Sequence, residues 1–231
     1  HAYNDGLDRN AEAELEFERI VEPNENELTA EFELEQEWEN SDDRYMQYDL
    51  FQTPQESLDE RQQIDEEGTE TEGSAEVDYI RPLWGETKLE AGYEADFERL
   101  DNSLYSESMN FSTGDMQPDT LLNNQFSYNE MMHSLYSLMN GSFGDFNAQL
   151  GLRVERAVST FHQETQGEEF DNEYFSAFPS VHLSYSATQA NTFNVSYSKR
   201  VRRPSSWQMN PYPDYDDPTF RRIGNPYLTP E

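Results

Sequence analysis

The sequence predicts an all-β protein made of antiparallel up-and-down strands, about eight in number. Two observations support this. Apolar and charged residues alternate with a period of two over long stretches, and short turns alternate along the chain with long polar connections. A period of two places successive side chains on opposite faces of a strand, whereas a helix would spread both classes around its circumference.

The first expected hairpin spans residues 9–39. Apolar residues occupy the odd positions of 11–17 and glutamates the even positions of 12–18. A turn around Pro23 follows, and the residues from Leu28 to Trp38 then alternate with glutamates in the same way. Two sets of side chains should therefore lie on opposite faces of this hairpin. They are Glu12, Glu14, Glu16, Glu31, Glu33 and Glu35 on one face, and Leu15, Phe17, Phe32 and Leu34 on the other.

Three further hairpins follow by the same rule, at residues 74–100, 125–160 and 174–203. The first strand of the pair at 125–160 is the least regular, because apolar residues such as Met131 and Met132 occupy both faces. The connections between hairpins are long and polar, and we expect them to be loops. They span residues 40–73, 101–124, 162–172 and 202–231.

The length of the expected strands indicates a membrane protein. Strands of water-soluble domains usually have about 5–6 residues, whereas these have about 12. At ~3.3 Å per residue and a tilt of ~40°, such a strand rises ~30 Å, which is the thickness of a bilayer's hydrocarbon layer. Outer-membrane barrels also sort short turns to the periplasmic end and long loops to the outside. We therefore expect transmembrane β-barrel strands, surrounded by outer-membrane lipid, with the four long loops outside.

The charge of the chain is strongly negative. It has 48 Asp and Glu against 15 Lys and Arg, for a net charge of -33, and only Lys88 and Lys199 are lysines. Such an excess repels phosphate, which excludes nucleic acid as a partner. An acidic chain with few lysines is also typical of proteins that work in high salt. This leaves an alternative: a secreted or surface-exposed acidic β-sandwich of a halophile that serves as a binding module.

No catalytic motif is present. The four histidines lack metal-ligand spacing, there are no cysteines, and neither a nucleophile elbow nor a phosphate-binding loop occurs. Asp214, Asp216 and Asp217 have oxygen spacing that could suit Ca²⁺, but Pro213 and Pro218 flank them, and a solvated loop is the favoured interpretation. The sequence therefore predicts a protein that is not an enzyme and needs no cofactor or metal.

The most specific pattern lies at the C-terminal end. A strand ends in a basic run, and a loop follows that is rich in proline and aromatic residues, with regularly placed Asn-Pro and Asp-Pro pairs. The positions that carry the pattern are Tyr197, Ser198, Arg200, Arg203, Pro204, Asn210, Pro211, Asp217, Pro218, Gly224, Asn225, Pro226, Leu228, Pro230 and Glu231. This stretch resembles the barrel of TonB-dependent outer-membrane receptors, especially the Bacteroidetes-type outer-membrane β-barrel family.

The resemblance implies a receptor that takes up a small nutrient, such as a siderophore complex or a saccharide, across the bacterial outer membrane. It also implies a TonB system that acts through a plug domain. Receptors of this kind have a plug and about 22 strands. We expect residues 1–231 to form a partial barrel domain without the plug, as an internal piece of a larger receptor.

Ligand contact is expected in the loop 202–231. Trp207, Tyr212 and Tyr215 offer flat faces on which a sugar ring or an aromatic chelator could stack. Four arginines could attract an anionic ligand and bind its carboxylates. They are Arg202, Arg203, Arg221 and Arg222. The structural alternative is that these arginines neutralise glutamates of the wall and that Trp207 packs the loop against the barrel.

The facing glutamates of the first hairpin predict that added salt stabilises the protein. The Debye length falls to ~3 Å at 1 M salt, so the repulsion between these carboxylates is screened. We expect the midpoint of urea unfolding to rise between low salt and molar KCl. An unchanged midpoint would count against both the crowding of carboxylates and a high-salt habitat.

Overall fold

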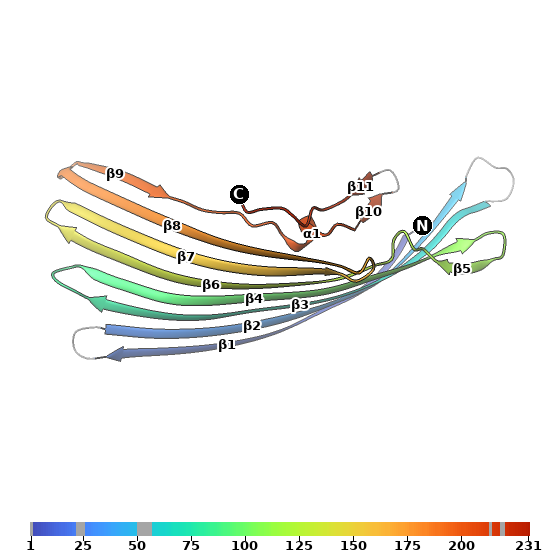
Figure 1. Ribbon diagram of the computed structural model, residues 1–231, viewed down its shortest axis with the longest axis horizontal. Coiled ribbons are helices and arrows are strands. Elements are labelled where there is room, and N and C mark those ends of the chain that lie inside the picture. Colours follow the sequence, from blue (N-terminus) through green and yellow to red (C-terminus); the bar gives the residue numbers. More distant parts are fainter. Residues whose placement is uncertain (1, 22–25, 50–56, 213, 218–219) are drawn as a thin grey trace.

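The computed structural model describes residues 2–21, 26–49, 57–212, 214–217 and 220–231. Within these residues, nine antiparallel strands form one curved sheet whose order follows the chain (Figure 1). The strands are β1 (Ala2–Val21), β2 (Asn26–Asp49), β3 (Ser57–Pro82), β4 (Lys88–Asn110), β5 (Asp115–Pro118), β6 (Asn124–Phe143), β7 (Phe146–Gln163), β8 (Glu168–Thr188) and β9 (Asn191–Ser198). The predicted all-β, up-and-down architecture is confirmed.

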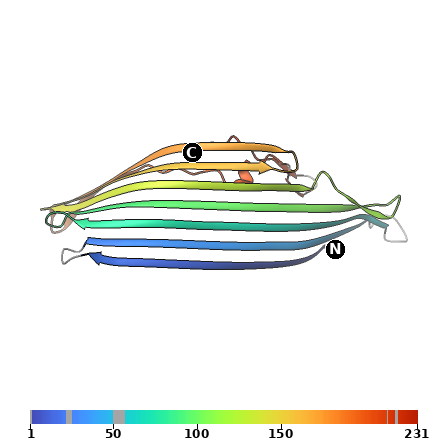
Figure 2. The ribbon, with the colours of Figure 1, turned by 60° about the horizontal axis from the view of Figure 1, so that its bottom comes forward.

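The short strand β5 pairs with the end of β4, so β4 and β6 are neighbours in the sheet. After β9 the chain leaves the sheet and forms α1 (Ser206–Met209) and a small hairpin of β10 (Asp214–Asp217) and β11 (Phe220–Arg222). We call residues 199–231 the C-terminal segment. Both ribbon views show it on the β6–β8 side of the sheet (Figures 1 and 2).

Most residues of three expected long loops are in fact strand, and this part of the sequence interpretation was wrong. Residues 40–49 and 57–73 belong to β2 and β3, residues 101–110 to β4, and the connection between β7 and β8 is only 164–167. These stretches are polar on both faces, so the alternation that reveals a strand is lost. The backbone ladder nevertheless continues from β2 to β3 without regard to side-chain polarity.

The register assigns every strand residue to one of two faces. Directly opposed residues share a face, and Glu16, Glu31, Glu76 and Glu94 follow one another across β1 to β4. We call this the polar face. The opposite, apolar face carries Leu15 and its partner Phe32. The expected division of glutamates and apolar residues in the first hairpin is therefore confirmed.

Apolar side chains on the apolar face form a continuous belt, which we call the apolar belt. It covers the outward positions of residues 11–17, 28–34, 73–79, 89–97, 131–139, 148–158, 175–185 and 193–197. The belt spans 5 to 11 residues of each strand, about eight on average, which is comparable with the ~25 Å apolar band of transmembrane barrels. Beyond it, on the side away from the short turns, β2 and β3 continue with mostly polar residues on both faces.

The apolar belt is not covered by any other described part of the chain. Leu15 is 70% exposed, Phe175 is 75% exposed, and Leu135 and Val195 are similarly open. A β-sandwich would bury such side chains against a second sheet. The alternative of an acidic β-sandwich is therefore not favoured, because the strands of the main sheet lie in one layer with its apolar face open. Among the described residues, no helix is long and apolar enough to cross a membrane.

Two glycines of the sheet make room for aromatic rings. A Cβ at Gly73 would overlap the ring of Phe97, its partner on β4, and a Cβ at Gly92 would overlap Tyr136. A ring that lies across a glycine covers backbone that has no side chain of its own. The ring of Phe97 thus packs on β3 from its position on β4 on the apolar face, and the ring of Tyr136 packs on β4 from β6 on the polar face.

The opposite chemistry of the two faces predicts opposite responses to a positive charge. Leu15→Arg puts a guanidinium into the middle of the apolar belt, and we expect the free energy of unfolding in lipid vesicles to fall by about 2–4 kcal/mol. Glu14→Arg, one residue away on the polar face, relieves repulsion with Glu33 and should not destabilise. Equal losses from both substitutions would contradict the assignment of faces.

Candidate functional site

The candidate functional site is the polar face of β6, β7 and β8, where the C-terminal segment lies. The segment starts where β9 ends, and the Lys199 N–H donates to the Pro179 carbonyl at 3.3 Å. Its two ends meet, because Arg202 and Glu231 exchange a pair of backbone hydrogen bonds at 2.8 and 2.9 Å. The segment is thus a closed loop placed against the wall of the sheet.

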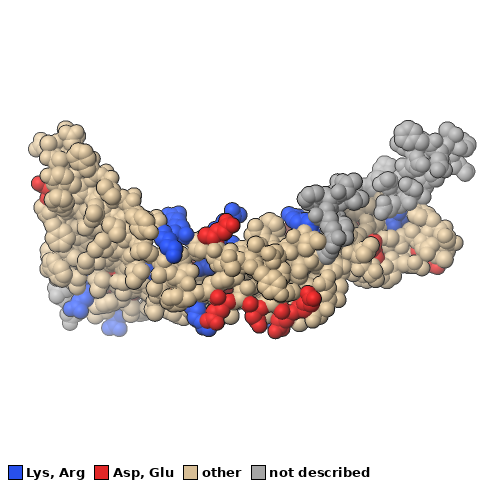
Figure 3. All heavy atoms as spheres, turned by 45° about the horizontal axis from the view of Figure 1, so that its top comes forward, with Lys and Arg blue, Asp and Glu red and all other residues tan. Residues whose placement is uncertain are grey.

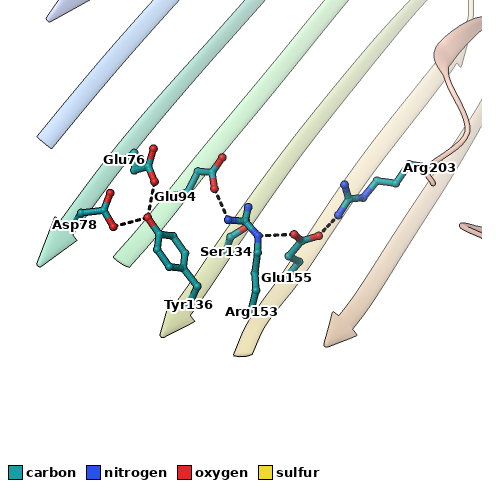
Figure 4. A network of polar contacts seen from close by, with 8 residues as sticks. All are labelled: Glu76, Asp78, Glu94, Ser134, Tyr136, Arg153, Glu155 and Arg203. Atoms are coloured by element: carbon teal, nitrogen blue, oxygen red, sulfur yellow. Dashed lines mark hydrogen bonds and ion pairs between the residues drawn. The ribbon is translucent and has the colours of Figure 1, made fainter. Parts of the chain in front are cut away.

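A chain of charged groups fixes the segment to the wall (Figure 4). On the polar face, the Arg153 guanidinium lies between Glu94 at 2.5 Å and Glu155 at 2.6 Å. The second oxygen of Glu155 pairs with Arg203 of the C-terminal segment. Glu155 is largely buried, with 8% of the residue exposed. Two guanidinium groups therefore pair with the two oxygens of this carboxylate.

The same network continues toward β3. The Tyr136 hydroxyl contacts Glu76 and donates to Asp78 at 2.5 Å, and the Arg153 guanidinium lies 5.5 Å from the centre of its ring. Together with the pairs around Arg153, these contacts link side chains of β3, β4, β6 and β7 to the segment (Figure 4). The wall and the segment therefore share one polar framework.

An apolar contact supplies the second attachment. Met209, at the end of α1, is 2% exposed and packs against Phe126, Tyr128 and Phe161 of β6 and β7. The rings of Phe126 and Phe161 stack with centroids 5.2 Å apart. This is the hydrophobic core cluster of the described residues, and it exists only because the segment covers that part of the polar face. Methionine fills such irregular gaps well.

Backbone contacts hold the rest of the segment. The Tyr174 hydroxyl donates to the Leu228 carbonyl at 2.8 Å, and the Asn172 amide donates to the Pro226 carbonyl at 3.3 Å. Both donors stand on β8. Within the segment, Gly224 donates to the Asn210 carbonyl at 2.8 Å and Asn225 to the Gln208 carbonyl at 2.8 Å. The Asn210 and Asn225 side chains accept from the backbone two residues further on.

These contacts explain several positions of the C-terminal sequence pattern. A Cβ at Gly224 would lie 2.5 Å from two carbonyl oxygens, so only glycine allows this crossing of the chain. Asn210 and Asn225 stabilise turns, and Arg203 makes the ion pair to the wall. Tyr215 and Arg221 belong to β10 and β11, but their side chains, like those of Asp214, Asp216 and Asp217, lie outside the described residues, as does all of Pro218.

Some of the expected ligand-contact residues are buried or paired with the wall, and others are exposed to solvent. Tyr212 is buried, and its hydroxyl donates to the carbonyls of Thr120 and Leu121 at 3.1 and 3.2 Å. Arg203 is likewise engaged with the wall. By contrast, Trp207 is 56% exposed, with the Arg222 guanidinium 5.2 Å from its ring centre.

Arg202 is exposed as well, with its backbone paired to that of Glu231. The exposed candidate ligand contacts are therefore Trp207, Arg202 and Arg222.

Carboxylates crowd on the polar face of β2 to β4, away from the segment. Glu72 stands directly between Glu35 and Glu98 in the register. Beyond the apolar belt, burial and then the charge of Glu72 raise the pKa of Glu70 above its usual value. Among the described residues, no group of three or more His, Asp or Glu side chains is arranged to hold a metal ion. Figure 3 shows one side of the molecule, where acidic and basic side chains lie close together near the middle.

Fold and site together define a class of protein: a membrane-spanning antiparallel β-barrel wall with an apolar outside and a polar inside that holds a loop. The sequence agrees, because residues 20–231 match the family model of the outer membrane protein beta-barrel family. The chain belongs to this family, and the protein lies in the bacterial outer membrane. No curated protein matches it.

A solved structure shows a similar fold. The chain is similar to the ferric citrate transporter FecA in its unliganded form, with a TM-score of 0.55 and 14% identity over 85% of this chain. It is also similar to the copper transporter OprC, with a TM-score of 0.49 and 12% identity over 80% of this chain. The chain spans 28% of the FecA chain and 30% of the OprC chain. The resemblance to the transporter FecA is one of fold.

Three of the most important side chains were missed by the sequence interpretation. Arg153 and Glu155 stand on the polar face of β7, a strand judged mainly by its apolar face, and Met209 is an isolated apolar residue in a loop. Only the alternation in β7, which places an arginine and a glutamate two residues apart on one face, could have indicated the first two. Nothing local marks Met209.

The crossing at Gly224 predicts that Gly224→Ala opens the C-terminal segment while the sheet stays intact. The added Cβ would collide with the carbonyls of Gln208 and Asn210. We expect amide hydrogen exchange in residues 205–228 to speed up by about tenfold or more. Gly68→Ala is the matched control, because its Cβ would meet its nearest neighbour at an ordinary 3.7 Å. Unchanged exchange in Gly224→Ala would show that the segment does not depend on this crossing.

Proposed function

We propose that this chain forms part of the wall of a TonB-dependent barrel that takes up a small nutrient, and that its C-terminal segment contacts the nutrient. The observation that carries the proposal is the placement of the segment. It is attached to the polar face through Arg203 and Met209, and it still presents Trp207 outward. A loop held on the inner wall of a transport barrel lies where a solute must pass.

The exposed side chains of the C-terminal segment indicate the chemistry of the nutrient. The Trp207 ring offers an apolar surface for stacking against a sugar ring or an aromatic chelator. Arg222 beside it and the exposed Arg202 supply positive charge in a chain of net charge -33. A ligand that combines a flat ring with a carboxylate fits this pair best. Siderophore complexes and acidic saccharides have this character.

Direction and energy complete the proposal. The polar ends of β2, β3 and β4 face the cell exterior, and the short turns face the periplasm, as in other outer-membrane barrels. A plug that contacts the TonB system would bind against the polar face and close the path. The chain has a role in transport and none in catalysis.

The role of Trp207 can be tested by uptake in cells that carry the natural-length protein. We expect Trp207→Ala combined with Tyr215→Ala to lower uptake of ⁵⁵Fe-labelled ferric chelates or of fluorescent oligosaccharides by about tenfold or more, since stacking contributes about 0.5–1.5 kcal/mol per ring. Trp84→Ala is the matched control, because Trp84 is equally exposed at a short turn at the other end of the sheet.

Barrel assembly is measured separately, by the heat-dependent shift in gel mobility. Lost uptake with intact assembly supports ligand contact, whereas lost assembly shows that the loop is architectural. Uptake that persists after a protonophore collapses the proton gradient would contradict the TonB coupling.

A further inference from the structure

The basic residues of the sheet are distributed against expectation. Strands β1 to β8 contain two basic residues on the polar face, Lys88 and Arg153, although most of their carboxylates are there. The others lie on the apolar face, where they gain nothing from those carboxylates. They are Arg9, Arg19, Arg44, Arg61, Arg81, Arg99 and Arg156.

Five of these outward arginines stand at or near the edges of the apolar belt. Arg19 follows Phe17 and Arg81 follows Tyr79 at the short-turn edge. At the opposite edge, Arg9 precedes Ala11 and Arg99 follows Phe97, while Arg156 lies between Val154 and Val158, one outward position inside the belt. A guanidinium at a belt edge is at the depth of the lipid headgroups, where it costs little and meets phosphate.

Arg9 differs from its counterparts at the same edge. Arg99 pairs with Asp101 at 2.8 Å and Arg156 with Glu173 at 2.7 Å. Within the described part of the chain, no ion pair includes Arg9. Asp8 and Glu39, its neighbours in sequence and register, lie on the polar face. On the face of Arg9, the nearest carboxylates are Asp5, four residues before it, and Glu67, which is opposite Asn40 two strands away. Neither forms an ion pair with Arg9 in the described part of the chain.

A depression surrounds this arginine. It has a volume of about 540 Å³ and is lined by Leu7, Arg9, Trp38 and Asn40. Arg9 lies directly opposite Trp38 in the register, and Leu7 directly opposite Asn40, so the four side chains form one block on the apolar face. Trp38 is 39% exposed, as an interfacial tryptophan would be.

We propose that this block binds one molecule of an anionic, phosphate-bearing membrane lipid. Arg9 and the Asn40 amide donate to the phosphate oxygens, and the Trp38 ring lies at the level of the ester groups. The acyl chains run down the apolar belt over Ala13, Leu15 and the opposed Phe32 and Leu34 of β2. A lipid fits better than a soluble anion, because the belt continues directly from the block.

The test uses the natural-length protein in vesicles whose lipids carry brominated acyl chains, which quench tryptophan fluorescence at contact distance. The signal of Trp38 is isolated by subtracting the emission of Trp38→Phe. We expect brominated phosphatidic acid to displace phosphatidylcholine from this site with a preference of about tenfold, as one charge-assisted phosphate contact allows. Arg9→Gln should reduce the preference to about one, and Arg9→Lys should retain most of it.

Arg61→Gln is the control, because Arg61 is exposed on the same face but far beyond the belt. A preference that survives Arg9→Gln would overturn the proposal, and so would an equal loss in Arg61→Gln, which would indicate a general surface charge. Displacement of the lipid by millimolar inorganic phosphate would show a phosphate site without lipid specificity. The heat-dependent gel shift of each variant confirms that the barrel is assembled. None of these results depends on nutrient uptake.

Discussion

The structure depends on one constraint: in the hydrocarbon layer of a membrane, every backbone N–H and C=O must find its partner within the protein. Apart from β5 and β9, the strands of the sheet have from 18 residues in β7 to 26 in β3, and their backbone ladders run through the apolar belt and beyond it. Because the backbone satisfies this demand by itself, the side chains need not pack into a common core. They only have to suit the medium that each face meets, lipid on one side and the polar interior on the other. This is why Leu15 is exposed and yet correctly placed.

Because most side chains of the sheet do not pack against other protein, a hydrophobic core forms only where another segment covers the sheet. The described residues have one cluster of buried aromatic side chains, and it lies under the C-terminal segment, where Met209 covers Phe161 and Tyr128. At that place the polar face meets protein instead of water, so its side chains become apolar or form neutralised ion pairs such as Arg203 with Glu155. The polarity of the side chains on each part of the wall therefore reflects whether protein or water covers it. On the polar face of β1 and β2, the facing glutamates record an aqueous or basic environment.

The sequence predicted the fold well wherever two different media meet across the sheet. Alternation from Ala11 to Phe17 gave the correct faces, because lipid and water select different residues at successive positions. It failed in residues 40–73, where water lies on both sides and selects polar residues at every position, so β2 and β3 looked like a loop. For the site, the fixed positions of the C-terminal pattern predicted that the loop is special and that Arg203 could neutralise a wall glutamate. They could not predict Glu155 as the partner, because that contact joins residues 48 positions apart.

The distribution of charged residues between the two faces offers an explanation of the negative net charge other than a high-salt habitat. A chain with a charge of -33 looks like a halophilic protein when its carboxylates are assumed to cover an outer surface. In this sheet the glutamates of β1 to β4 are stacked on the polar face in direct register, while seven arginines of the strands lie on the lipid side. Most of the negative charge of the strands therefore lies on the polar face of the wall, and five of the seven outward arginines lie near the edges of the apolar belt. An acidic interior needs no saline habitat, since cations drawn from water or basic groups of a bound protein domain can compensate it. The composition is then a consequence of membrane architecture, and the two faces of one strand explain it better than the environment of the organism does.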